Sequence, residues 1–227
     1  MNTETLFEDG TPTRTELERL AQEAKGVVFR NCNFEGLDMS QLDIVNWRFE
    51  KCNLSKSSLT GARLEDVTFV NCRAPAASFA GSTLSDTAVD GGDFGNTNFL
   101  GARLSTVQFT KCKMTGINLS EVRALDVTFA DTLLVLGLLP KFSFRKAQLL
   151  GIDFSDADLR QCDFREAVFV DCSLREANIA DCRFQGADLR GADLGGVRLT
   201  DARRFKGAII SKRQAGDLLG QLGLNVV

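Results

Sequence analysis

Seven cysteines are the side chains in this 227-residue sequence best suited to metal binding or redox chemistry. Such sites need cysteines that cluster, as in a C-x-x-C motif, and histidine often completes them. The sequence has no C-x-x-C motif and no histidine. The cysteines recur instead at multiples of 20 residues, and they form two sets. One set is Cys32, Cys52, Cys72, Cys112 and Cys172, and the other is Cys162 and Cys182. This spacing predicts inert thiols packed in a core, with no metal and no cofactor.

Carboxylates are the second group that could carry chemistry. Paired acids work as a general acid and base only in a cleft that separates their pKa values. Neighbouring acids such as Glu65 and Asp66 fall in a pattern that predicts an open outer surface. Nothing in the sequence predicts a phosphate-binding loop or a second domain that would form a cleft. We therefore expect that the protein is not an enzyme.

Four acidic residues share a spacing of multiples of 20: Asp66, Asp86, Asp126 and Glu166. Thr106 and Lys146 occupy the intervening places. If one turn of the fold takes 20 residues, these acids lie in one line on the outside. Three arginines precede places in this line by three residues and would partly neutralise it: Arg63, Arg103 and Arg123. A binding surface and a solvated face of mixed charge both fit this pattern.

A repeat of five residues must position all these groups. From Phe29 to Leu199, every fifth residue is almost always apolar, and none of these 35 positions is charged. The residue two places earlier is usually small or apolar, and in the C-terminal half it is mostly Ala or Cys. The other three positions of each five are mostly polar or charged. The stretch GADLRGADLGG, residues 186–196, contains the unit in its plainest form.

A period of five fits neither an α-helix nor a flat strand. Large residues would drift around a helix, and they would alternate between the two faces of a strand. The pattern needs a chain that turns a corner every five residues, and four corners make a coil of 20. Phe29, Phe49 and Phe69 would then stack in one column, as would the cysteines. The sequence predicts an all-β solenoid of about nine coils with a solid core.

The two ends resemble caps. Residues 13–25 predict a helix with Thr13 and Glu16 at capping-box spacing, and residues 211–222 predict a second helix with Ser211 and Gln214 at the same spacing. The phase of five breaks after Ala202 and resumes one residue late at Ala208 and Ile210. The expected organisation is a capping segment at 1–26, a solenoid at 27–210 and a C-terminal helix and tail at 211–227.

Residues 131–142 break the outward pattern. Leu134 and Leu139 keep the inward phase, while outward positions between 133 and 140 hold apolar side chains. These are Leu133, Val135, Leu136, Leu138 and Pro140. An exposed apolar patch indicates a contact site. A bulge that buries these side chains is the alternative, and it is favoured because Gly137 and Pro140 permit irregular turns.

The net charge of −3 is mild, with 27 basic and 30 acidic residues. No apolar run approaches the ~20 residues of a membrane helix. The N-terminal residues MNTETLFEDG carry acids where a signal peptide would carry basic and apolar residues. We expect a cytoplasmic protein that does not enter a membrane.

The repeat resembles that of the pentapeptide-repeat proteins, whose unit is a small residue or Cys, a polar residue, Leu or Phe, and two polar residues. The resemblance covers about residues 27–210. It implies a right-handed quadrilateral β-helix, since that is the fold of the family. The five-residue repeat keeps its phase from residue 29 to residue 199, so no inserted loop is expected.

The C-terminal sequence SKRQAGDLLGQLGLNVV is similar to the ending of the Qnr-type quinolone-resistance proteins. This resemblance implies a homodimer joined through the C-terminus, and a shape and charge that imitate DNA. It further implies binding to DNA gyrase or topoisomerase IV, protection from antibiotic or toxin poisons, and no direct contact with nucleic acid. The dimer residues would be Leu218, Leu219, Leu222, Leu224 and Val226, and the acids at 66, 86, 126 and 166 would face the partner. The alternative is a structural interaction module with another partner.

Overall fold

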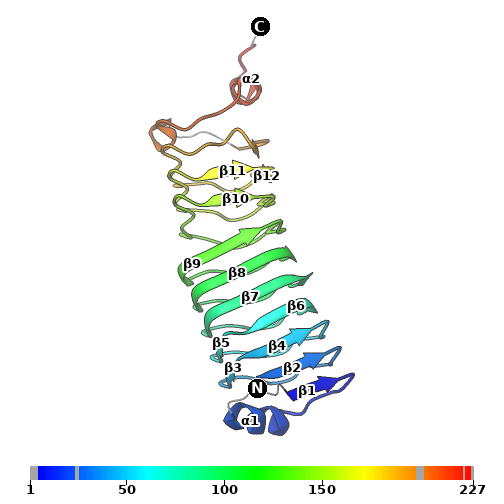
Figure 1. The fold of residues 1–227 in the computed structure, drawn as a ribbon. Coiled ribbons are helices and arrows are strands. Elements are labelled where there is room, and N and C mark those ends of the chain that lie inside the picture. The colour runs from blue at the N-terminus through cyan, green and yellow to red at the C-terminus, as the bar shows by residue number, and fades with distance from the viewer. Residues whose placement is uncertain (1–4, 24–25, 198–201, 222, 226–227) are drawn as a thin grey trace. The chain divides into compact units, whose positions relative to one another are not determined.

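The computed structural model describes residues 5–23, 26–197, 202–221 and 223–225, and the chain divides into two compact units at residues 132 and 133. Each unit is a stretch of β-solenoid whose strands run parallel (Figure 1). Strand partners are 20 residues apart, as in Val27↔Trp47 and Gln148↔Val168. The predicted all-β solenoid of about nine coils is confirmed.

The chain turns at each corner through a residue whose backbone has the left-handed conformation. From residue 31 to residue 186, every fifth residue has a positive φ, between 49° and 72°. Glycine, asparagine and aspartate adopt this conformation with the least strain. The corners hold many such residues, but they also hold Lys51, Glu121 and Leu136. The stacked coils on either side therefore hold many corners in a conformation that their residue type disfavours.

The N-terminal unit contains one helix and nine strands among its described residues. They are β1 (Thr5–Glu8), α1 (Arg14–Glu23), β2 (Val27–Arg30), β3 (Asp43–Val45), β4 (Trp47–Glu50), β5 (Arg63–Glu65), β6 (Thr68–Arg73), β7 (Thr83–Asp93), β8 (Arg103–Lys113) and β9 (Arg123–Ala130). One side of the solenoid pairs its strands in the order β1-β2-β4-β6-β7-β8-β9, and β3 pairs with β5, which pairs with β7. The longer strands β7 and β8 run around corners, so one strand serves more than one side.

The core follows the pentad. All described members of the predicted inward series are buried except Ala124, which is exposed, and Ile179, which is half-buried. Equivalent rings of successive coils stack, with Phe29 and Phe49 5.4 Å apart at their centroids and Phe49 and Phe69 4.9 Å apart. Leu199 lies outside the described residues. The predicted columns of stacked core side chains are therefore present in the structure.

The C-terminal unit has shorter strands. They are β10 (Gln148–Leu150), β11 (Val168–Val170), β12 (Cys172–Ser173) and β13 (Ala192–Asp193), followed by the 3-10 helix η1 (Ala202–Phe205) and the helix α2 (Lys212–Gly220). β10 pairs with β11, and β12 pairs with β13. Asp188 pairs with Ile209, 21 residues away, which confirms the predicted one-residue shift of phase.

Both predicted capping helices are present. The Thr13 amide donates a hydrogen bond to Glu16 Oε2 at 2.7 Å, and Leu17 and Leu20 are buried. Ser211 caps α2 in a full capping box with Gln214. Strand β1 was not predicted. Its Phe7 ring stacks on Phe29, but the two residues are 22 apart in the sequence, so Phe7 does not fit the period of 20.

The segment 133–140 does not bulge, so the favoured prediction for it was wrong. Leu133 and Leu138 pair in regular register with Asp153 and Asp158, and Leu136 takes the ordinary left-handed corner. The apolar side chains consequently point outward, with Leu133, Leu136 and Leu138 exposed by 43%, 58% and 42%. Gly137 and Pro140 are accommodated within the regular coil.

Candidate partner-binding surface

The acidic residues of the N-terminal unit form a column on its outer surface. Asp66 and Asp86 occupy equivalent places on adjacent coils, since Glu65 pairs with Ser85 and Thr68 with Ala88. Asp126 lies two coils beyond Asp86, with Thr106 between them. All three aspartates are exposed. Within the described part of the chain, none of the three makes an ion pair, so their charges face solvent.

The backbone supplies a separate reason for aspartate in this column. Asp66, Asp86 and Asp126 are corner residues with φ of 53°, 49° and 52°. Aspartate is among the residues that tolerate this region best. The period of five in the sequence predicts a corner here, but it does not indicate a left-handed residue. The column therefore fits both a structural corner and an acidic binding line.

Within the described residues, the three arginines that were predicted to neutralise the column in part form no ion pair with its aspartates. Arg63 forms its ion pair with Glu65 on the same strand. Arg103 on β8 and Arg123 on β9 are neighbours in the backbone register. Neither arginine forms an ion pair with another described residue. Acidic and basic side chains thus run in parallel lines along this side of the N-terminal unit.

Glu166 differs from the three aspartates. It lies in the C-terminal unit, where its carboxylate contacts Arg145 Nη2 at 3.2 Å and Lys146 Nζ at 3.7 Å. Both cations come from the coil before it. Its charge is therefore shared with two cations of its own unit, and it is the weakest of the four predicted partner-binding residues.

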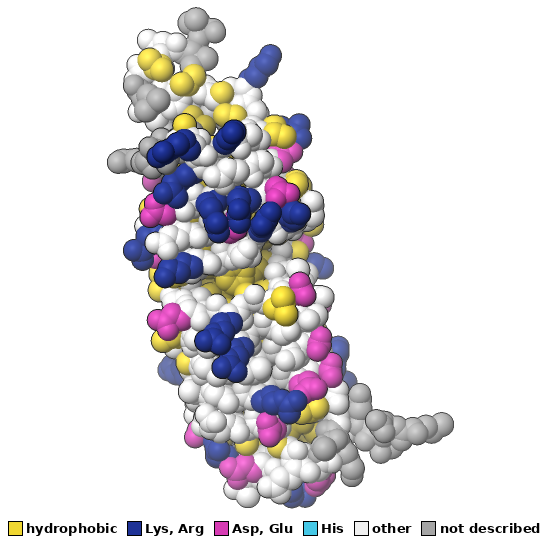
Figure 2. Space-filling model, turned by 90° about the vertical axis from the view of Figure 1, so that its left-hand side faces the viewer, with side chains coloured by type: hydrophobic (Ala, Val, Ile, Leu, Met, Phe, Trp, Pro, Cys, Tyr) yellow, Lys and Arg dark blue, Asp and Glu magenta, His cyan; other side chains and the backbone are white. Residues whose placement is uncertain are grey.

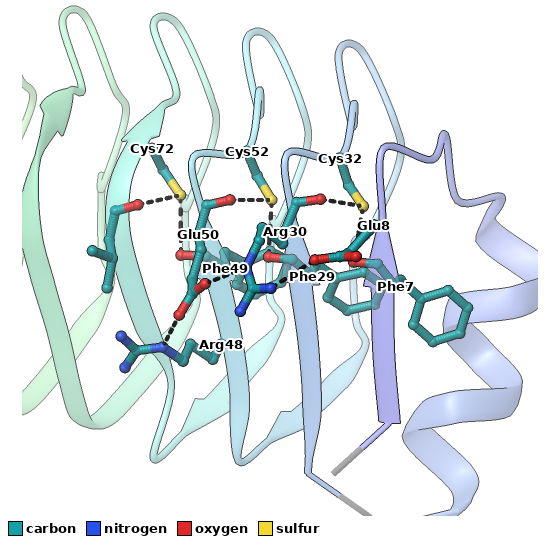
Figure 3. Close-up of polar contacts among 11 residues, drawn as sticks. Phe7, Glu8, Phe29, Arg30, Cys32, Arg48, Phe49, Glu50, Cys52 and Cys72 are labelled. Atoms are coloured by element: carbon teal, nitrogen blue, oxygen red, sulfur yellow. Dashed lines mark hydrogen bonds and ion pairs between the residues drawn. The ribbon is translucent and has the colours of Figure 1, made fainter.

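The cysteines form a packing ladder. Their thiols donate to backbone carbonyls of the preceding coil, as from Cys52 Sγ to the Phe29 oxygen at 3.3 Å and from Cys72 Sγ to the Phe49 oxygen at 3.3 Å (Figure 3). All seven are free and buried. Burial raises the pKa of the Cys112 thiol to about 12. The protonated thiol of Cys112 is therefore a poor nucleophile and a poor metal ligand.

A charged ladder runs along the outside of the same coils (Figure 3). Arg30 bridges Glu8 at 2.6 Å and Glu50 at 2.9 Å, and Arg48 contacts the other oxygen of Glu50 at 2.6 Å. These carboxylates and guanidiniums satisfy one another. This ladder ties β1, β2 and β4 together, and it leaves little charge for a partner.

The C-terminal helix closes its unit. Gln214 is buried, and its Nε2 donates to the carbonyls of Leu189 and Ala192, both at 2.7 Å. Leu218 is also buried within its own chain. Leu219 and Leu224 are exposed by 39% and 55%. The predicted dimer residues Leu222 and Val226 lie outside the described residues.

Residues 5–23, 26–197, 202–221 and 223–225 contain no group of three or more His, Cys, Asp or Glu side chains that could hold a metal ion. None of the described helices has the length and apolar character needed to cross a membrane.

Models of the pentapeptide repeat match most of the sequence. A model described as a pentapeptide repeat region matches residues 23–99, and one described as pentapeptide repeats in eight copies matches residues 84–123, 152–191, 167–203 and 177–211. A search of curated protein sequences finds no match.

Two solved structures share the fold at low sequence identity. A trypsin-treated form of QnrB1, a plasmid-mediated fluoroquinolone resistance protein, matches with a TM-score of 0.55 and 18% identity, covering 99% of this chain and 98% of that one. HetL from the cyanobacterium Nostoc, a pentapeptide repeat protein involved in heterocyst differentiation regulation, matches with a TM-score of 0.52 and 17% identity over 85% of this chain and 88% of that one. At such identity the likeness establishes the fold alone.

Proposed function

Since the chain belongs to the pentapeptide-repeat family, we propose that it works without catalysis, by presenting its outer surface to a partner protein. The partner is a type II topoisomerase such as DNA gyrase or topoisomerase IV. In this proposal the protein imitates DNA and shields the enzyme from an antibiotic or a toxin that traps cleaved DNA. Such a partner requires a cytoplasmic location.

The observation that carries this proposal is the column of Asp66, Asp86 and Asp126. Three exposed carboxylates without ion pairs repeat at coil spacing on a closely packed scaffold. A topoisomerase binds the phosphates of DNA through basic side chains, and a line of fixed carboxylates is complementary to such a surface. Full-length likeness in fold to QnrB1, a resistance protein, supports the same assignment.

We expect that Asp86→Lys combined with Asp126→Lys will weaken binding to gyrase by tenfold or more and will make the remaining binding less dependent on salt. Reversed charges repel a basic partner, and fewer charge contacts give a shallower salt dependence. Folding should be preserved, because Lys51, Lys56 and Lys111 occupy equivalent corners with φ of 53°, 58° and 55°. The measurement is a supercoiling assay with gyrase and a fluoroquinolone, in which the protein is titrated. A direct binding assay measures its affinity for gyrase.

A matched control reverses two acids elsewhere on the same unit. Asp90 and Glu121 are also exposed, and Asp90→Lys with Glu121→Lys changes the net charge equally. This control should retain most of the binding. If the parent protein is folded and has no effect on gyrase at any salt concentration, the topoisomerase proposal fails.

The second candidate is an interaction module with a different partner. It is favoured by the exposed side chains of Leu133, Leu136 and Leu138, which project from a regular coil. Exposed apolar patches of this kind mark contact sites in soluble proteins. The likeness in fold to HetL, a protein involved in heterocyst differentiation regulation, is equally compatible with such a role. This candidate takes precedence if the gyrase assays are negative.

We further propose a homodimer through the C-terminal element. Leu219 and Leu224 are exposed beside a coil end, and a two-fold contact would remove both from water. Leu219→Asp with Leu224→Asp should give a monomer, since a carboxylate at the centre of such a contact lacks a partner. Light scattering over a concentration series measures this. An intact protein that is already monomeric throughout the series contradicts the dimer.

A further inference from the structure

The C-terminal unit carries a surface of opposite charge to the aspartate column. Six basic residues, here called the basic face, lie on three consecutive coils and on the segment that follows them. They are Arg145, Lys146, Arg165, Arg183, Arg203 and Lys206. Among the described residues of this surface, the carboxylates of Asp163 and Glu166 lie among these cations, and Asp181 pairs with Arg204 beside them. Figure 2 shows the Lys and Arg side chains gathered over this unit.

The backbone register brings these residues together. Ser143 pairs with Asp163, and Asp163 pairs with Arg183, which aligns three successive coils. The Lys146 amide donates to the Arg165 carbonyl, and Gly186 donates to Lys206, so the same side of the solenoid continues into the last segment. Parallel coils ~4.8 Å apart therefore present a cation on every rung.

A buried carboxylate fixes two of the guanidiniums. Asp163 is only 6% exposed, and it accepts from Arg165 Nε at 2.8 Å, from Arg165 Nη2 at 2.7 Å and from Arg183 Nη2 at 3.0 Å. The hydrogen bonds from Arg165 first, and then the positive charge of Arg183, lower the pKa of Asp163 below its ordinary value. The carboxylate stays ionised and holds both side chains in place, which reduces the entropy lost when they bind.

The chemistry of this surface indicates its partner. An open side of a solenoid suits an extended polyanion better than a small ligand, which needs a concave pocket. The outward positions of these coils on this side hold Ser143, Arg145, Asp163, Arg165, Arg183 and Gln185, with no aromatic or aliphatic side chain. Protein interfaces depend on such anchors, and single-stranded nucleic acids stack their bases on aromatic rings. Cations without anchors are the mark of binding to a phosphate backbone.

We infer that the basic face of the C-terminal unit binds the phosphate backbone of double-stranded nucleic acid without sequence specificity. This goes beyond the proposed topoisomerase binding, and it differs from the expectation, drawn from the family resemblance, of no direct contact with nucleic acid. The aspartate column of one unit and the basic face of the other then serve different partners, a basic protein and a duplex.

The test measures binding of the full chain to a fluorescein-labelled 30-base-pair DNA duplex by fluorescence anisotropy at several salt concentrations. We expect a Kd of about 10⁻⁴ to 10⁻⁶ M that weakens steeply with salt. Arg145→Gln with Lys146→Gln should reduce affinity at low salt about tenfold and lower the slope of log K against log salt by about 2. Both residues are exposed and contact only Glu166 among the ion pairs of the described chain, so circular dichroism should remain unchanged.

The matched control is Arg103→Gln with Arg123→Gln, which removes two exposed arginines from the N-terminal unit. It should change duplex affinity less than threefold. The inference is overturned if the folded protein does not bind the duplex at low salt, or if the control weakens binding as much as the test variant. It is also overturned if the single-stranded form of the probe binds more tightly than the duplex. Binding of a fluorescent polyglutamate peptide in place of the duplex would assign the basic face to an acidic protein instead.

Discussion

Phe109→Asp is expected to abolish cooperative folding of the N-terminal unit. Phe109 is 1% exposed, and its ring stacks on Phe129 at 5.1 Å and meets Phe99 edge-on at 6.1 Å. Loss of a buried phenylalanine costs about 3–5 kcal/mol. A buried carboxylate without a partner adds a further cost of several kcal/mol. The sum reaches the whole stability of a typical domain, about 5–15 kcal/mol.

Chemical denaturation followed by far-ultraviolet circular dichroism measures this effect. Thr110, the next residue along β8, points outward and supplies the control. Thr110→Asp should unfold within ~0.5 kcal/mol of the parent, as is usual for surface changes. A Phe109→Asp protein that unfolds like the parent would mean that the inward phase has been assigned to the wrong residues.

Gly92→Ala is expected to destabilise the same unit by about 3 kcal/mol or more, the sum of backbone strain and overpacking. A Cβ at this position would lie 2.0 Å from the Cys72 carbonyl oxygen, and Gly92 has a φ of 104°. Neither the carbonyl nor the glycine can move freely, because Gly92 pairs with Cys72 and Cys112 in the sheet. Thermal unfolding monitored by circular dichroism checks the result.

Gly81→Ala is the matched control for this clash. Gly81 is a corner with φ of 63°, and a Cβ there would meet nothing within 4 Å. We expect a loss of about 1 kcal/mol, from left-handed strain alone. Gly92→Cys makes the contrast sharper, since the column of Cys32, Cys52, Cys72 and Cys112 would suggest cysteine at 92. Equal stability of Gly92→Cys and the parent would show that the close approach of the two backbones is unimportant.

The sequence predicted the inward series, the 20-residue coil and both capping helices, because each depends on local spacing. An apolar residue every fifth position marks which side chains leave water, and capping-box spacing marks where a helix begins. The one-residue shift before Ile209 was also visible as a break in phase. Strand β1 was missed because it stacks on β2 without the period of the repeat.

Tertiary structure decided the matters that depend on which columns are neighbours and where side chains point. Glu166 has the same 20-residue spacing as the aspartates, but in three dimensions it forms ion pairs with Arg145 and Lys146. Likewise, Gly137 and Pro140 suggested a bulge, yet hydrogen bonds to the next coil keep residues 133–140 regular and leave Leu136 exposed.

The basic face illustrates the same division. Its cations are spread over residues 145–206, and only the stacking of coils puts Arg165 and Arg183 on one buried carboxylate, that of Asp163. By itself, the sequence determined that this protein is a solenoid with a solid apolar core, since a one-dimensional period reports the alternation of inward and outward positions. The tertiary structure alone decided which outward charges neutralise one another across coils, because pairs such as Arg183–Asp163 and Lys146–Glu166 join residues that lie a full coil apart along the chain.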